Sequence, residues 1–209
     1  MVELKSLFNA VRGIASAQEV KSLFIALRET IRGTPAYAHP NGFLVYDIYK
    51  ESNVDLRLHV WEGSVVAQPF HEIHDHVYDV RSVILTGCLL QKTWDERSSR
   101  YGSFKEYSVT YRDGTSSLEP TGRKIEASVA AQEHLRAPLR YELDAGRLHS
   151  VEPLVFPSAT LFLRDLHEGA GNPRVLGTAD AIACPPAERQ QVEEAVTLSG
   201  LEAVFSSID

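Results

Sequence analysis

The stretch PFHEIHDHVYDVRSVILTGCLL, residues 69–90, carries His71, His74 and His76 close to three acidic residues. In a β-strand, residues two apart lie on the same face, so His74 and His76 share one face while Asp75 lies on the other. Imidazole nitrogen is a ligand of iron, nickel, copper and zinc, but a mononuclear site needs at least one further protein ligand. This stretch therefore predicts a strand that carries half of a metal site.

The third ligand is predicted to be His149, in the segment LDAGRLHSVEP at 143–153. Gly146 supplies a tight turn directly before a strand that begins with this histidine. His71 is a possible fourth ligand, but its strand parity is opposite to that of His74, which favours a position at the rim of the site. Glu72 is in phase with His74 and could either ligate or act as a base.

The first 33 residues have helical periodicity, with two apolar stripes that predict two packed helices. Ser16 and Glu19 stand at capping-box spacing before the second of these helices. A further helix is predicted in the tail, opened by Pro185 and Pro186 and interrupted near Gly200.

From Phe43 to about Leu166 the hydrophobic period changes to two, as in NVDLRLHVW at 53–61. Several short strands follow one another without a helix between them, which predicts a mainly β barrel or sandwich. The polar segment from about 95 to 133 is expected to form a hairpin that projects from it. We expect a single domain with N-terminal helices at 1–35, the barrel at 43–166 and a C-terminal extension at 167–209.

Composition restricts the partners of this chain. Its formal net charge is −7 and its pI is about 5.6, which disfavours binding to nucleic acid or to anionic membranes. No apolar run approaches the roughly 20 residues of a transmembrane helix. The two cysteines lack a pairing framework and the N-terminus lacks a secretory pattern, so we expect a cytoplasmic protein, monomeric or homodimeric, that binds small molecules.

The pattern His74-x-His76 with Gly87, followed by Gly146-x-x-His149, resembles the two motifs of the cupin superfamily. That resemblance implies a small double-stranded β-helix, or jelly-roll, barrel in which the two motifs face each other and hold one metal ion. More narrowly, IHDH at 73–76 and GRLHSVEPLVFPSATLFLRD at 146–165 look like the cysteine dioxygenase branch. Members of this branch have N-terminal helices and use three histidines.

The chain departs from both patterns at informative positions. Arg81 stands where cupins usually carry a glutamate ligand, and guanidinium cannot bind a metal. In the mammalian-type dioxygenases this position is a cysteine cross-linked to a tyrosine, whose counterpart here is at or near Arg164. The serine and histidine before that tyrosine correspond most nearly to Thr160 and Phe162, so the Ser-His-Tyr relay of that branch is also missing.

The function predicted from these residues is a non-haem Fe(II) dioxygenase that uses O2 and a small anionic, carboxylate-bearing substrate, with a thiol as one candidate. His74, His76 and His149 would hold the metal, Arg81 and Arg164 would bind the carboxylate, and Tyr78 would donate a hydrogen bond in the pocket. Arg164 is equally compatible with a surface ion pair.

The sequence leaves three alternatives open. The barrel could be an isomerase, lyase or hydrolase that uses zinc, nickel or manganese as a Lewis acid. It could also bind a ligand or metal without turnover, or be a structural barrel whose histidines have no function.

Overall fold

The structure is a computed structural model, and it describes residues 3–67, 73–112, 115–165, 171–178, 187–188 and 190–208. Within these ranges the chain forms helices near both ends and two antiparallel sheets between them. The mainly β fold with terminal helices is therefore confirmed. None of the described helices has the length and apolar character needed to cross a membrane.

The strands form two sheets, in which neighbouring strands are hydrogen-bonded to each other. In spatial order, the first sheet consists of β1 (Ala36–His39), β2 (Phe43–Glu51), β3 (Val54–Trp61), β11 (Ser158–Asp165), β5 (Asp79–Thr86) and β9 (Leu139–Leu143). The second sheet consists of β13 (Ala187–Glu188), β8 (Thr115–Arg136), β6 (Cys88–Ser98), β10 (His149–Pro153), β4 (Ile73–His74), β12 (Arg174–Thr178) and β7 (Phe104–Arg112), with β7 also paired to β8.

The order of the strands along the chain explains the barrel. From β3 to β6 the chain alternates between the sheets, and from β8 to β11 it alternates back. The returning strands pair antiparallel with the outgoing ones in reverse order, β6 with β8, β5 with β9, β4 with β10 and β3 with β11. The chain is thus one long hairpin wound around itself, which is the predicted double-stranded β-helix of the cupin fold.

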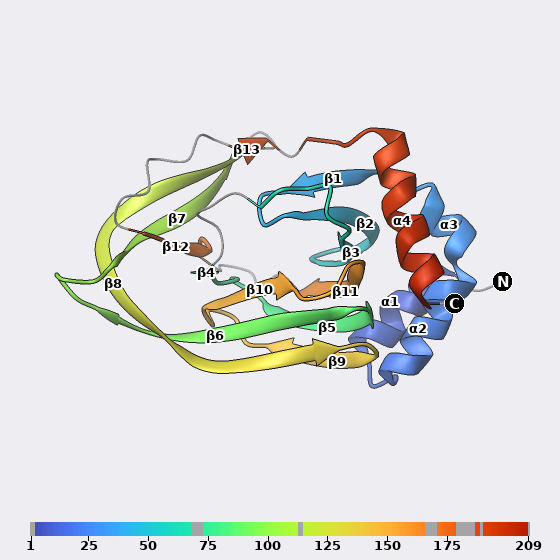
Figure 1. The fold of residues 1–209 in the computed structure, drawn as a ribbon, viewed down its shortest axis with the longest axis horizontal. Coiled ribbons are helices and arrows are strands. Elements are labelled where there is room, and N and C mark those ends of the chain that lie inside the picture. Colours follow the sequence, from blue (N-terminus) through green and yellow to red (C-terminus); the bar gives the residue numbers. More distant parts are fainter. Residues whose placement is uncertain are drawn as a thin grey trace.

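Three described strands, β1, β12 and β13, lie outside the range expected for the barrel, and β13 pairs with β8. β1 pairs with β2, and β12 pairs with both β4 and β7. The segment from 95 to 133 forms, as expected, a large part of a projecting hairpin. Figure 1 shows β7 and β8 curving away from the helices at the opposite end of the molecule.

The helices cover the outer face of the first sheet (Figure 1). They are α1 (Leu4–Arg12), α2 (Ala17–Ala26), α3 (Arg28–Arg32) and α4 (Glu194–Ile208). Their apolar side chains share one core with the alternate strand residues Leu56, Leu58 and Val60 of β3. The other residues of β3, including Arg57 and His59, consequently face the interior of the barrel, where they line cavities.

The capping box is present, since the Ser16 side chain accepts from the backbone N–H of Glu19 and the Glu19 carboxylate accepts from that of Ser16. Two helical predictions need correction. The second predicted helix is divided at Leu27 into α2 and α3. The tail helix is not interrupted at Gly200, whereas Pro185 and Pro186 lie outside the described residues.

Gly200 continues the helix because of its packing. A Cβ atom at this position would lie 2.7 Å from the hydroxyl oxygen of Tyr46 and 2.9 Å from Leu44. The glycine therefore allows α4 to approach β2 closely, and its low helix propensity is offset by that contact.

Candidate metal centre

The structure brings the three predicted histidines together. His74 ends β4, His76 follows it after one residue, and His149 begins β10 directly opposite His74 in the antiparallel register. One ligand atom from each histidine lies within 4.8 Å of the others, and His149 is only 6% exposed. Across-strand pairing thus joins motifs that are far apart in sequence.

Backbone contacts fix the geometry of the two motifs. Gly146 has a positive φ of 76°, as expected for the predicted tight turn. Its N–H donates to the carbonyl oxygen of His76 at 2.7 Å, which ties the turn before His149 to the other motif. The Nδ1 atom of His149 lies 3.3 Å from the carbonyl oxygen of Arg147, so a proton on Nδ1 would leave Nε2 free for a metal.

Asp75 anchors the segment between His74 and His76. This residue is 4% exposed, and its carboxylate accepts from the backbone N–H of Arg174 at 2.6 Å and from the Nε of Arg174 at 2.7 Å. Arg174 also reaches Glu96 and Glu106. The segment that carries two histidines is therefore joined to β12, β6 and β7.

The electrostatics favour neutral imidazoles. Burial, reinforced by the neighbouring histidines, holds the pKa of His76 and His149 well below the ordinary histidine value. A neutral imidazole is the form that binds a metal. Because metal–nitrogen bonds are about 2.0–2.1 Å long, small side-chain rotations would allow one ion to contact all three rings. The donor set fits a divalent transition metal.

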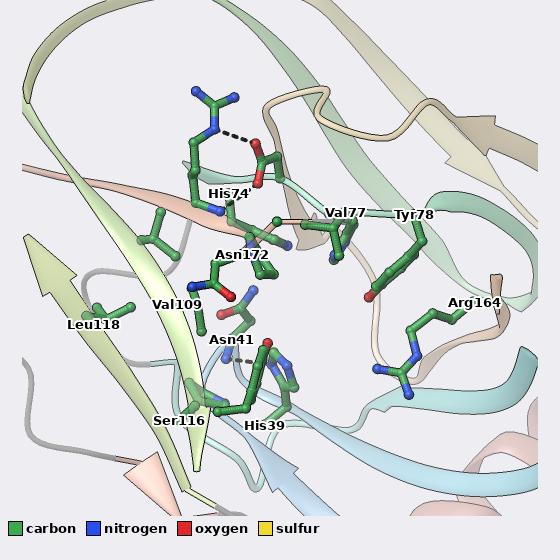
Figure 2. A pocket seen from close by; sticks show the side chains of 18 of the residues that line it. His39, Asn41, His74, Val77, Tyr78, Val109, Ser116, Leu118, Arg164 and Asn172 are labelled. Carbon is green, nitrogen blue, oxygen red and sulfur yellow. Dashed lines mark hydrogen bonds and ion pairs between the residues drawn. The ribbon is translucent and has the colours of Figure 1, made fainter. Parts of the chain in front are cut away.

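Two cavities meet at the histidines. The outer cavity, of about 300 Å³, lies between His74 and His76 on one side and the β7–β8 hairpin on the other. Figure 2 shows the labelled side chains Val109, Leu118 and Ser116 on the hairpin side of this space. The inner cavity, of about 80 Å³, extends into the barrel and touches all three histidines.

Tyr78 lines both cavities. Its ring stacks on that of His76, with centroids 4.9 Å apart and planes 19° apart. Burial raises the pKa of Tyr78 to about 12, against a smaller opposing effect of the Arg164 guanidinium, so the phenol is protonated at neutral pH. Its hydroxyl is directed away from β5 toward the space near Arg164 (Figure 2).

Arg164 lies in the outer cavity, 5.6 Å from the centre of the Tyr78 ring. It makes a two-pronged ion pair with the buried Asp55. Asp55 also pairs with Arg57 at 3.2 Å, and Arg57 reaches Asp47 at 3.0 Å. Arg164 thus lines the cavity and is held by a buried carboxylate, which differs from the surface ion pair considered from the sequence.

Arg81 is not brought to the histidines, which corrects the expectation that it faces the pocket. In β5 the inward positions are Val80 and Ser82, so Arg81 lies on the opposite face, toward the helices. Its guanidinium donates to the carbonyl oxygen of Arg12 at 3.3 Å and lies 3.9 Å from Glu142. His71 and Glu72 lie outside the described residues.

Two histidines that the sequence pattern does not single out lie beside the site. His39 and His59 line the inner cavity and stack on the two sides of a small ring cluster, His39 on Phe43 and His59 on Phe162. Phe162 in turn contacts His76 edge-on at 5.8 Å between centroids. The available signal is the parity of His59 with Arg57 on β3, which places both on the face opposite the apolar residues.

Comparison of the sequence with models of known protein families and with characterised proteins finds no match. Among solved structures, the chain is similar to a hydroquinone 1,2-dioxygenase in complex with Cd²⁺ and 4-hydroxybenzonitrile, with 13% identity and a TM-score of 0.34 over 58% of this chain and 63% of that one. It is also similar to the hydroquinone 1,2-dioxygenase of Sphingomonas sp. TTNP3, with 13% identity and a TM-score of 0.32 over 56% and 62% of the two chains.

A third similar structure is procruciferin, an 11S globulin from Brassica napus, with 14% identity and a TM-score of 0.37. The alignment covers 68% of this chain and 35% of procruciferin. The chain thus spans a little over three fifths of the dioxygenases and about a third of the globulin.

Proposed function

We propose that this protein is a non-haem Fe(II) dioxygenase that acts on a small molecule through a sulfur or oxygen atom of that substrate. The observation that carries the proposal is the convergence of three buried or half-buried imidazoles on the wall of the inner cavity. Within the described residues, no carboxylate or thiol belongs to this cluster. Three neutral ligands leave several coordination positions for substrate and O2.

The protein's own groups would bind and orient the reactants. His74, His76 and His149 would hold the ion, and a ferrous ion would supply Lewis acidity and one-electron chemistry toward O2. The protonated phenol of Tyr78, which lines both cavities, would donate a hydrogen bond to a bound reactant. The hairpin β7–β8 would shield the reactants from bulk water.

The carboxylate expected on the substrate is not required by this proposal. It depended on Arg81, which lies on the opposite face of β5, and on Arg164, which is held by Asp55. The narrower likeness to cysteine dioxygenases, and with it a thiol substrate, stays part of the proposal, since three histidines suit that chemistry.

The test combines metal analysis with oxygen consumption. Protein produced in iron-supplemented medium is expected to contain close to one iron per chain and to consume O2 with members of a thiol and phenol panel. His149→Ala should lose both properties, whereas His134→Ala, at an exposed position of β8, should keep them. Retention of iron and oxygen uptake by His149→Ala would contradict the proposed site.

The identity of the bound metal also distinguishes the proposed dioxygenase from the main alternative, a non-redox metal enzyme. The same three imidazoles suit zinc or nickel. Zinc as the resident metal, together with no oxygen uptake, would turn the proposal toward a non-redox isomerase, lyase or hydrolase.

A further inference from the structure

The charges that line the outer cavity are compensated within the protein. The charged lining residues that the structure describes are Arg57, Asp75, Arg164 and Arg174. Arg164 pairs with Asp55, Arg57 with Asp47 and Asp55, and Asp75 with Arg174. A charged substrate group entering this space would lose its hydration and meet no uncompensated partner among these residues.

The wall opposite the histidines carries apolar side chains and, in Tyr111 and Ser116, uncharged hydroxyl groups. Val109 of β7 and Leu118 of β8 are paired across the hairpin and both line the cavity. Val77, Pro173 and Val175 add apolar surface around the same space. At about 300 Å³, the cavity is at the lower end of the range for sites that bind small organic ligands.

The polar groups suited to a ligand in this cavity include uncharged amides. Asn41 lines both cavities, and its buried side-chain oxygen has no hydrogen-bond partner in the part of the chain that the structure describes. Figure 2 shows the amides of Asn41 and Asn172 between the hairpin residues and the histidine side. An uncharged donor on a ligand could satisfy the Asn41 oxygen, and a buried polar atom gains from such a partner.

From these observations we infer that the substrate is uncharged apart from the one atom that binds the metal. Its body, small and largely apolar, lies in the outer cavity against Val109 and Leu118, and the asparagine amides bind its neutral polar group. This inference rests on the proposed function for the metal. A single ionised sulfur or oxygen remains compatible with the site because the dication itself compensates that charge.

Three thiols of similar shape test the inference: 3-sulfanylpropanoate, 3-sulfanylpropanamide and 3-methylbutane-1-thiol. They share the metal-binding sulfur and differ at the far end, which is a carboxylate, an amide or an isopropyl group. Binding is measured under nitrogen by the visible absorption of the Co(II)-loaded protein, which changes when sulfur binds the metal. We expect both uncharged thiols to bind at least about tenfold more tightly than the carboxylate, or about 1.4 kcal/mol.

A charge placed in the wall provides the matched variant. Leu118→Lys should reduce the preference for the uncharged thiols by about tenfold or reverse it, because it supplies an uncompensated cation. Val129→Lys, at a 47% exposed position of the same strand, should leave the preference unchanged. Thermal unfolding checks that both variants fold. If Leu118→Lys does not fold, the preference of the unsubstituted protein between charged and uncharged thiols decides whether the inference holds.

Equal or tighter binding of the carboxylate to the unsubstituted protein would overturn the inference, as would failure of all three thiols to bind. The outcome is independent of turnover because no oxygen is present. A protein that shows the expected preference but consumes no O2 would keep the inference about the cavity and lose the dioxygenase function.

Discussion

At the scale of single residues, Tyr78 is the group that we propose donates a hydrogen bond to a bound reactant. Its ring stacks on His76 and its pKa of about 12 keeps the phenol protonated. We predict that Tyr78→Phe lowers kcat for oxygen consumption by about 10²-fold, the lower end of the usual effect of losing one hydrogen-bond donor to developing charge, with iron content unchanged. Tyr141→Phe is the control, since Tyr141 also lines the inner cavity. Equal losses in both variants would exclude a specific role for Tyr78.

The positions of some site residues can be predicted from the sequence better than those of others. His74, His76 and His149 follow from strand parity and one glycine turn, which are local properties. The position of Arg81 depends on which face of β5 the helices cover, and a strand buried on both faces gives no sign of this. The ion pair between Arg164 and Asp55 joins β11 to β3, a long-range register that periodicity does not contain.

At the scale of elements, the short strand β4 depends on Asp75 for its place in the second sheet. Asp75→Asn keeps the shape of the side chain but removes the charge that accepts from Arg174. We predict roughly tenfold weaker metal binding, the lower end of the effect of groups that support metal ligands, measured by competition with a chromogenic chelator. Glu126→Gln, which breaks the exposed pair with Arg97, should leave metal affinity unchanged. Unchanged affinity in Asp75→Asn would show that β4 is held without it.

Hydrophobic periodicity predicts some of the strands of this fold and not others. The alternation in NVDLRLHVW identifies β3, and the order of short strands indicates a barrel. The extra strands β1, β12 and β13 are short and are not recognisable from periodicity, because their pairing partners, more than their own sequences, make them strands. From the sequence, Gly200 suggests a break in the terminal helix. The structure explains this glycine instead by the close approach of the Tyr46 hydroxyl to the continuous helix.

At the scale of the whole molecule, the attachment of α4 to the barrel should make stability fall at alkaline pH. Tyr46 of β2 is fully buried, and its hydroxyl donates to the carbonyl oxygen of Thr197 at 2.8 Å. Burial raises the pKa of Tyr46 above its ordinary value of 10. Below about pH 10 both the folded and the unfolded chain keep this proton, so Tyr46 adds no pH dependence there. Above it only the unfolded chain releases the proton, and the free energy of unfolding falls by up to about 1.4 kcal/mol per pH unit.

Replacing this tyrosine separates its hydrogen bond from its titration. We expect Tyr46→Phe to lower the free energy of unfolding at pH 8 by about 1 kcal/mol, the usual contribution of one hydrogen bond. Between pH 10 and 11 the variant should lose less stability than the unsubstituted protein, because it has one fewer group that releases a proton only on unfolding. Urea unfolding from pH 8 to 11 measures both effects, with Tyr101→Phe, at a 79% exposed position, as the control. Parallel pH profiles for Tyr46→Phe and the unsubstituted protein would mean that Tyr46 does not couple the helical layer to the barrel in this way.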